Sequence, residues 1–180
     1  MRPIIIICLI VISCITASCV KDTDFDQAEQ IALTPEFELD LIYFTVEPGQ
    51  FQASGGLGES FRVTDTTDIR FLDDNFVVDA LTRAEIFFRF TNSIPRDFTT
   101  QIEFLNDNDI VRYAFEIPVA GGSVSAPVIT EHIEVIETAE DIAELTRSSQ
   151  VVISVFVPES PQDLEGTLNL QSKTTYFLEY

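Results

Sequence analysis

Apolar residues recur at every second position from Phe37 onward, in short runs that are separated by turn-forming residues. Alternation with a period of two places successive side chains on opposite faces of a β-strand, so each run predicts a strand with one buried face. The run over 84–91 is an example, because Ile86, Phe88 and Phe90 fall on the same face. The pattern therefore predicts an all-β domain.

The runs predict eight or nine strands, over residues 37–46, 61–63, 69–71, 84–91, 98–105, 110–119, 128–136 and 151–157, with a closing hairpin over 166–180 that turns at 172–173. Turn signals at a spacing of roughly eight to twelve residues, without alternating helices, are typical of an antiparallel β-sandwich of the immunoglobulin-like kind. A closed barrel is the alternative. The chain has no Trp, so the Cys-Trp-Cys cluster of antibody domains is absent and the prediction concerns only the architecture.

The period changes once, after the strand expected over 128–136. The residues from Thr138 to Asp141 read Thr-Ala-Glu-Asp, which has the form of a capping box at the start of a helix. Acidic residues in the first turn and Arg147 in the last turn suit the helix dipole. One short helical crossover over residues 138–147 is therefore predicted.

The N-terminal segment differs from the rest of the chain. Arg2 precedes an uncharged stretch from Ile4 to Val20, in which an apolar block gives way to small and polar residues. This order is typical of a secretory signal peptide, and the apolar block is shorter than the about 20 residues of a transmembrane helix. All three Cys lie in this segment, so a disulfide framework or a Cys-based metal site in the folded part is excluded.

The residues before Cys19, Ile15-Thr-Ala-Ser, resemble the lipobox of bacterial lipoproteins. In that family the Cys becomes the first mature residue and its thiol carries a diacylglyceryl group. Cys14 is the alternative lipidation site, because the residues before it also fit the pattern. Cys19 is favoured because a polar sequence begins directly after it. The resemblance implies a signal peptide over 1–18, an acidic tether over 19–35 and a β-sandwich domain over 36–180, with the membrane as a partner through the N-terminal lipid.

The charge of the chain narrows the classes of partner. Thirty Asp and Glu residues against ten Lys and Arg give a formal net charge of −20. Nucleic-acid binding needs a basic face, so this composition excludes it, and the same charge argues against docking on anionic lipid headgroups. An envelope protein or a glycan remains as a partner class.

No residue pattern in the chain predicts a catalytic, cofactor-binding or metal site. His132 is the single histidine, and its phase in the strand 128–136 predicts a position on the solvent face. The glycine loop over 54–60 lacks the Lys that a phosphate-binding loop needs after its last Gly, so it is interpreted as a connection. The acidic clusters 73–75 and 106–109 fit turn chemistry better than a Ca²⁺ loop.

Over its full length the chain resembles the small surface lipoproteins of Bacteroidota, on the lipobox at Cys19, the acidic tether, the strand 37–46, the strand end 90–93 and the closing segment 166–172. That resemblance implies a place on the outer membrane, exposed at the cell surface, and implies no activity. We therefore expect a non-enzymatic module with a binding or structural role. A glycan-binding accessory lipoprotein is the alternative, and a carboxylate-dependent envelope hydrolase would need two carboxyl groups roughly 5–9 Å apart.

Overall fold

The computed structural model describes residues 33–47, 50, 61–157 and 164–180 of the chain. The predictions for the signal peptide, Cys14, Cys19, residues 19–32 of the tether and the glycine loop 54–60 lie outside these described residues. The strands are β1 (Glu36–Val46), β2 (Phe61–Asp68), β3 (Leu81–Asn92), β4 (Phe98–Leu105), β5 (Val111–Val119), β6 (Val128–Ile136), β7 (Gln150–Val157) and β8 (Leu168–Leu178). A 3₁₀ turn, η2 (Arg70–Asp73), and two short helices, α3 (Asn75–Ala80) and α4 (Ala139–Leu145), complete the described elements.

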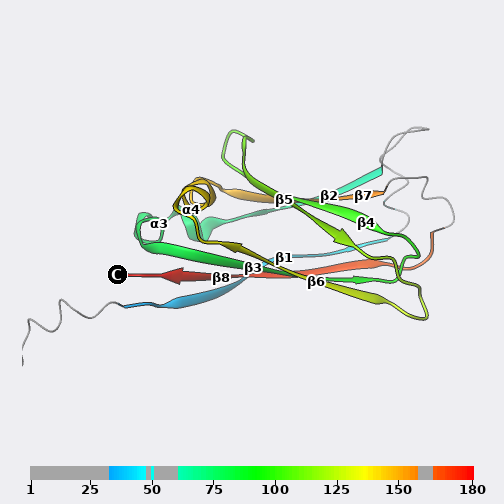
Figure 1. Ribbon diagram of the computed structural model, residues 1–180. Helices are drawn as coiled ribbons and strands as arrows, with labels where there is room; N and C mark the ends of the chain where they lie inside the picture. The colour runs from blue at the N-terminus through cyan, green and yellow to red at the C-terminus, as the bar shows by residue number, and fades with distance from the viewer. Residues whose placement is uncertain (1–32, 48–49, 51–60, 158–163) are drawn as a thin grey trace, which may run out of the picture. The chain divides into compact units, whose positions relative to one another are not determined.

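The strands form two four-stranded sheets, which lie as two layers (Figure 1). The strand order is β1-β8-β3-β6 in one sheet and β2-β7-β4-β5 in the other, and every neighbouring pair is antiparallel. The chain can be drawn as one long hairpin with the β4–β5 turn at its tip, in which β1 pairs with β8, β2 with β7, β3 with β6 and β4 with β5. Rolling such a hairpin into two sheets gives the jelly-roll order.

The predicted antiparallel β-sandwich is confirmed, but the immunoglobulin-like arrangement is not. An immunoglobulin fold pairs several consecutive strands, such as A with B, D with E and F with G. Among the described strands, β4 and β5 are the one consecutive pair that is hydrogen-bonded. Alternation in a sequence shows which face of a strand is buried, whereas its partner strand is chosen by contacts between distant segments. The sequence pattern was therefore compatible with both orders.

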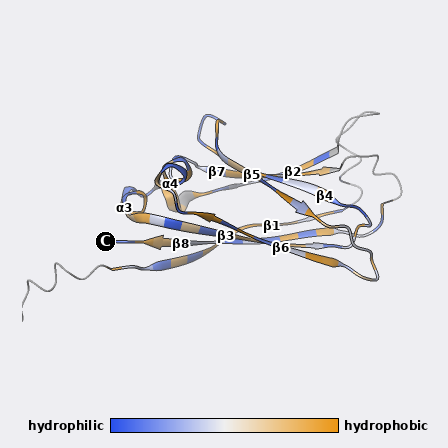
Figure 2. Cartoon of the chain, viewed as in Figure 1, coloured by the Kyte–Doolittle hydropathy of each residue, from blue (hydrophilic) through white to orange (hydrophobic). Residues whose placement is uncertain are grey.

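The core lies between the inner faces of the two sheets. Its largest fully buried side chains include Phe88 and Phe90 of β3 and Phe104 of β4. Ile86, Phe88 and Phe90 share the inner face, as their spacing predicts. Figure 2 shows the same alternation as hydrophobic and hydrophilic blocks along the strands.

The closing hairpin predicted around Ser172 and Lys173 is wrong, because β8 runs without interruption from Leu168 to Leu178. The Ser172 side chain points inward and is almost fully buried. Its hydroxyl accepts a hydrogen bond from the Ile42 N–H at 3.1 Å and donates one to the Ile42 carbonyl at 2.9 Å. These two backbone groups lie where the register of β1 shifts. Ser172 therefore serves as their hydrogen-bond partner and does not form a turn.

The segment around β2 also differs from its prediction. Residues 61–68 form one strand, and Ile69 lies before the 3₁₀ turn η2 instead of in a second strand. The helix after it, α3, was not predicted, so the described chain has two short helices and not one. Asp74 begins α3 as its N-cap, since its carboxylate accepts a hydrogen bond from the Phe76 N–H at 2.9 Å.

The predicted helix after β6 is confirmed as α4, but it ends at Leu145, so the prediction of Arg147 in its last turn is wrong. Thr138 is its N-cap and accepts a hydrogen bond from the Asp141 N–H at 3.1 Å, which is the capping interaction expected from the sequence. Ile142 and Leu145 are buried against the core. Neither helix of the described residues is long and apolar enough to span a membrane.

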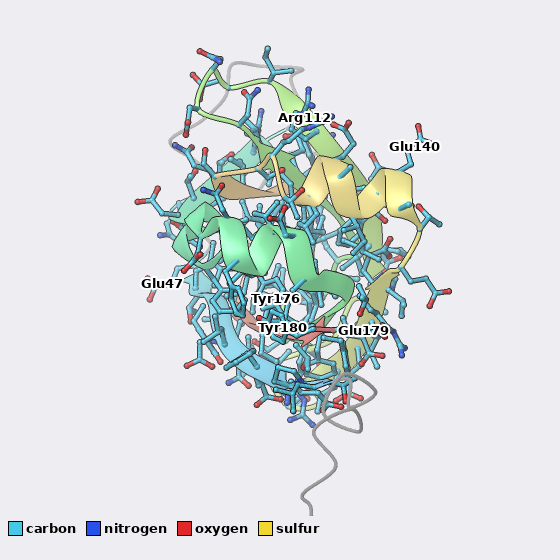
Figure 3. All side chains as sticks on the ribbon, turned by 90° about the vertical axis from the view of Figure 1, so that its left-hand side faces the viewer. Glu47, Arg112, Glu140, Tyr176, Glu179 and Tyr180 are labelled. Atoms are coloured by element: carbon cyan, nitrogen blue, oxygen red, sulfur yellow. The ribbon has the colours of Figure 1, made fainter. Side chains whose placement is uncertain are left out.

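Tyr176 links β8 to the η2–α3 segment at the end of the unit that Figure 3 faces. Its side chain is 3% exposed, and its ring lies 4.7 Å from the Phe71 ring. Burial raises the pKa of the phenol from 10.0 to about 12. The folded protein therefore keeps this proton at pH values where the unfolded chain has lost it.

This pKa predicts a loss of stability in alkaline solution. Between pH 10 and pH 12 the unfolded state binds fewer protons than the folded state, so the free energy of unfolding falls as pH rises, by up to about 1.4 kcal/mol per pH unit. Below pH 10 both states keep the Tyr176 proton, so the contribution of the buried phenol to the free energy of unfolding is fully present. Urea unfolding across this pH range should show a shallower decline for Tyr176→Phe than for the wild type. Equal slopes would contradict the prediction.

Candidate functional site

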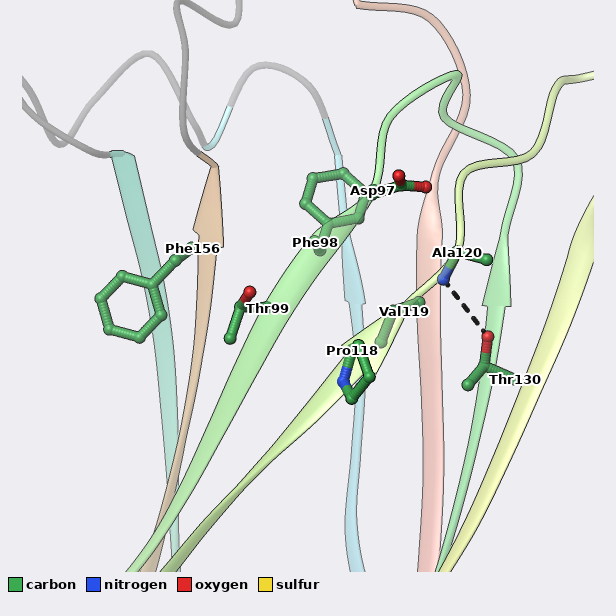
Figure 4. Close-up of a pocket in the computed structure, with 8 residues that line it drawn as sticks. All are labelled: Asp97, Phe98, Thr99, Pro118, Val119, Ala120, Thr130 and Phe156. Carbon is green, nitrogen blue, oxygen red and sulfur yellow. Dashed lines mark hydrogen bonds between the residues drawn. The ribbon is translucent and has the colours of Figure 1, made fainter.

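An open hollow of about 680 Å³ lies where β4 begins and β5 and β7 end. Its described lining consists of Asp97, Phe98, Thr99, Pro118, Val119, Ala120, Thr130 and Phe156 (Figure 4). These residues come from four strands and from the segments next to them. They are far apart in the sequence, so no local motif could have indicated the hollow.

The sheet register explains why these side chains meet. Arg62, Phe156, Thr99 and Pro118 are direct partners across β2, β7, β4 and β5, and they therefore form one row on the outer face of that sheet. The Arg62 guanidinium lies 5.6 Å from the centre of the Phe156 ring. It also donates hydrogen bonds to the Ser154 hydroxyl, at 2.9 and 2.6 Å. The Phe156 ring is thus held in place by a charged neighbour.

Asn92, the last residue of β3, fixes the segments that form the rim of the hollow. Its side chain is fully buried and donates hydrogen bonds to the carbonyls of Arg96 and Ala120, both at 2.9 Å. The side-chain oxygen Oδ1 of Asn92 accepts a third hydrogen bond, from the Ile94 N–H, at 2.9 Å. One side chain therefore joins the segment before β4 to the segment after β5.

The same segments leave room only for glycine at position 122. A Cβ atom at Gly122 would clash with the backbone carbonyl oxygen of Asn92. The neighbouring Gly121 N–H donates to the Asp97 carboxylate at 2.6 Å, and the Ala120 N–H donates to the Thr130 hydroxyl at 3.4 Å (Figure 4). This close approach of backbones holds the Asp97 carboxylate at the rim.

The chemistry of the hollow suits the binding of a polar ring compound. Phe156 and Pro118 offer apolar surface, while the Asp97 carboxylate and the Thr99 hydroxyl offer hydrogen-bonding groups. Aromatic or proline surface beside a few polar groups is typical of ligand sites. Of the described lining residues, Asp97 is the one with an ionisable side chain.

His132 does not lie on the solvent face, so that prediction is wrong. It pairs with Phe88, whose side chain points into the core, and its own ring stacks on Phe115 of β5 at 5.8 Å. The outward face of β6 instead carries Ile133 and its apolar neighbours. Polar residues can face inward here because β6 is an edge strand. Its inward side chains lie at the open side of the sandwich, where they remain partly hydrated.

A hydrogen-bonded network connects β6 to β5 beside His132. The Glu134 carboxylate lies 3.0 Å from His132 Nε2 and accepts a hydrogen bond from the Tyr113 hydroxyl at 2.6 Å. Burial, and next the hydrogen bond to Glu134, raise the pKa of the Tyr113 phenol. No sequence pattern predicts the contact between Tyr113 and Glu134, because the two residues lie on strands of different sheets. The network thus joins the edge strand β5 of one sheet to the edge strand β6 of the other.

The two acidic clusters take part in local backbone structure. Asp74 caps α3, as described above. In the β4–β5 turn, the Asn106 side chain accepts hydrogen bonds from the Asn108 and Ile110 N–H groups, both at 3.0 Å, and Asp109 has a φ of 57°. Within the described ranges, no three His, Cys, Asp or Glu side chains come together as metal ligands would.

Comparison with known proteins gives distant structural matches. No protein-family model matches the chain, and no curated protein matches it in sequence. The VP2 subviral particle of infectious bursal disease virus aligns with a TM-score of 0.44 and 8% identity, over 80% of this chain and 32% of that one. The Gx strain of the virus gives 0.43 and 13%, over 81% and 32%.

A third match is a protein from Parabacteroides distasonis described as a "putative secreted protein", with a TM-score of 0.43 and 16% identity over 64% of this chain and 38% of that one. The chain thus spans about a third of the length of the structures it matches. These scores are too low for any residue role or activity to be transferred. The strand order of the chain itself therefore defines its fold.

Proposed function

We propose that the protein is a lipid-anchored, non-enzymatic binding module of the outer membrane, exposed at the cell surface. The observation that carries this proposal is the position of the hollow. Leu33 and Tyr180 are joined by two backbone hydrogen bonds, at 3.2 and 3.0 Å, at the end where β1 begins. The hollow lies at the other end of the strands (Figures 1 and 4). A chain that is anchored at Cys19 would enter the sandwich at Leu33, at the end of the strands opposite the hollow.

The anchor itself rests on the lipobox before Cys19. Each buried CH₂ group contributes about 0.8 kcal/mol to membrane binding, and one acyl chain holds only reversibly, so durable attachment needs the two or three chains of a bacterial lipoprotein. Residues 20–32 would then link the lipid to the sandwich.

A Cys19→Ala substitution is expected to move the protein from the membrane to the soluble fraction almost completely. The physical reason is that alanine has no thiol to carry the diacylglyceryl group. Detergent phase partitioning and labelling with a radioactive fatty acid measure the change, and globomycin should cause the unprocessed precursor to accumulate. The control is Cys14→Ala, which should remain membrane-bound. Release by Cys14→Ala with retention of Cys19→Ala would place the lipid at Cys14.

We propose a glycan as the ligand class of the hollow. Sugar rings offer C–H faces that pack on rings such as those of Phe156 and Pro118, and hydroxyl groups that hydrogen-bond to acceptors such as the Asp97 carboxylate. The Arg62 guanidinium lies over the Phe156 ring, 5.6 Å from its centre. The open shape of the hollow is compatible with part of a longer chain entering it.

The test is a glycan array probed with the mature protein in mild detergent. We expect binding to a limited set of polysaccharides, weakened about tenfold or more by Phe156→Ala, because the loss of one ring contact in a small site removes well over 1 kcal/mol. The matched control is Phe177→Ala, since the Arg83 guanidinium lies 5.2 Å from the Phe177 ring on the other sheet. Absence of binding across the array, or equal loss in both variants, would contradict the glycan proposal.

A further inference from the structure

A smaller open hollow, of about 360 Å³, lies at the same end of the strands as the hollow of the proposed glycan site. Its described lining consists of Pro95, Ser123, Val124, Ser125 and Glu165, and we call it the Val124 hollow. These residues belong to the segments that follow β3 and β5 and to the segment that precedes β8. The three segments lie side by side at this end (Figure 1), because Asn92 is the cross-strand partner of both Val128 and Leu168.

Hydrogen bonds hold the walls of the Val124 hollow in place. The Ser93 N–H and the Ser93 hydroxyl both donate to the Thr167 carbonyl, at 2.9 and 3.0 Å, and the hydroxyl accepts a hydrogen bond from the Thr167 N–H at 2.7 Å. On the opposite wall, Ser123 and Ala126 exchange two backbone hydrogen bonds, both at 3.1 Å, which close the turn between β5 and β6. The lining is therefore ordered before a ligand binds, and this lowers the entropic cost of binding.

The chemistry of the Val124 hollow matches that of the hollow. Pro95 and Val124 offer apolar surface, and the Val124 side chain is 64% exposed. The Ser125 hydroxyl and the Glu165 carboxylate offer hydrogen-bonding groups. Among the described residues, no hydrogen bond or ion pair involves the exposed Glu165 carboxylate, so its oxygens remain available as acceptors. Both hollows thus place apolar surface beside hydroxyl and carboxylate groups, as sites for polar ring compounds do.

A narrow ridge separates the two hollows. Asp97 lines the hollow and Pro95 lines the Val124 hollow, and two residues of chain span at most about 7 Å. Gly121 and Gly122 lie beside this segment, because the Gly121 N–H donates to the Asp97 carboxylate at 2.6 Å and the Gly122 N–H donates to the Ile94 carbonyl at 2.9 Å. We call this pair the glycine ridge. It carries no side chains, so a ligand chain can pass over it from one hollow to the other.

We propose that the Val124 hollow is a second subsite for the glycan, so that the ligand is an oligosaccharide that crosses the glycine ridge and places sugar rings in both hollows. This inference rests on the proposed glycan function of the hollow, and it adds the length of chain that the site requires. Each hollow has the volume of a separate small-molecule site, about 300–1,000 Å³. Linked contacts in both bind more tightly than a contact in one, because the second contact forms intramolecularly.

The experiment uses oligosaccharides of increasing length, cut from a polysaccharide that binds on the glycan array, and the full mature protein in mild detergent. In titration calorimetry, affinity should rise about tenfold or more from the shortest fragment that binds to the longest. Phe156→Ala should weaken every fragment, whereas Val124→Asp should weaken the longest about tenfold and the shortest less than about twofold. The matched control is Ile110→Asp, which adds the same charge at a 53% exposed residue beyond the opposite end of β5 and should affect neither fragment.

Hydrogen exchange gives an independent readout, because the longest fragment should protect the amides of residues 123–125 and the shortest should not. Affinity that does not depend on length, equal effects of Val124→Asp and Ile110→Asp on the longest fragment, or equal protection by both fragments would overturn the second subsite and leave the glycan proposal intact. Absence of binding by every polysaccharide on the array would overturn the glycan proposal itself, and this inference with it. Circular dichroism and thermal unfolding verify that each variant remains folded.

Discussion

Replacing Asn92 with alanine is expected to lower the free energy of unfolding by about 3 kcal/mol, although the substitution removes no apolar contact. The side chain is fully buried and makes three hydrogen bonds to the backbone. In the variant the Ile94 N–H and the carbonyls of Arg96 and Ala120 lose these partners. The Ile94 N–H is buried, so leaving it without a partner costs more than the net value of its hydrogen bond, while the partly buried carbonyls of Arg96 and Ala120 add the loss of two further bonds.

The control for this prediction is Asn169→Ala. Asn169 is half-buried on the outer face of the same sheet, in the neighbouring strand β8, and its side chain donates one hydrogen bond, to the Thr45 hydroxyl at 2.9 Å. Its loss should cost less than about 1 kcal/mol. Urea unfolding at constant m-value gives both energies. Hydrogen exchange should also accelerate in residues 93–97 and 120–122 of Asn92→Ala alone, and equal destabilisation of the two variants would contradict the role assigned to Asn92.

The Asn92 variant also connects stability to the proposed function. Asp97 and Ala120, two lining residues of the hollow, belong to the segments that Asn92 joins. If the hollow binds a glycan, the variant should bind it more weakly even at temperatures where it is fully folded. The hollow thus depends on a buried side chain outside its lining.

The parts of this structure that the sequence could predict are those decided by neighbouring residues. The alternation in 84–91 correctly placed Ile86, Phe88 and Phe90 in the core, because side-chain direction in a strand depends only on position parity. Thr138 capped the expected helix, because a capping box involves residues three apart. The turn at residues 106–109 was likewise predicted, because its chemistry depends only on adjacent residues.

The parts that failed depend on which strands become neighbours. His132 has polar residues at alternate positions on both sides, and these suggested solvent, but β6 became an edge strand that turns them toward the open side of the sandwich. Ser172 looked like a turn residue, and its partner at Ile42 lies 130 residues away. The hollow is assembled by a register across β2, β7, β4 and β5, and no short segment of the sequence contains that information.

Phe88→Ala should be among the most destabilising single substitutions in the chain, lowering the free energy of unfolding by about 3–5 kcal/mol. The Phe88 side chain is fully buried, and its ring contacts Phe90 at 6.4 Å and Phe115 at 5.8 Å, from both sheets. Alanine would leave a cavity between the layers that the surrounding side chains can fill only in part. For a chain of this size the melting temperature should fall by roughly 10 °C.

The adjacent Phe87→Ala provides the control, because it removes the same ring from the same strand. Phe87 lies on the outer face of the sheet, opposite Lys173 and Ile133, and is half-buried. Its loss should cost no more than about 1 kcal/mol. A slip of one residue in the pairing of β3 would exchange the faces of these two side chains. Calorimetry of the pair therefore measures the register directly, and a larger loss for Phe87→Ala than for Phe88→Ala would show that β3 is packed with its opposite face inward.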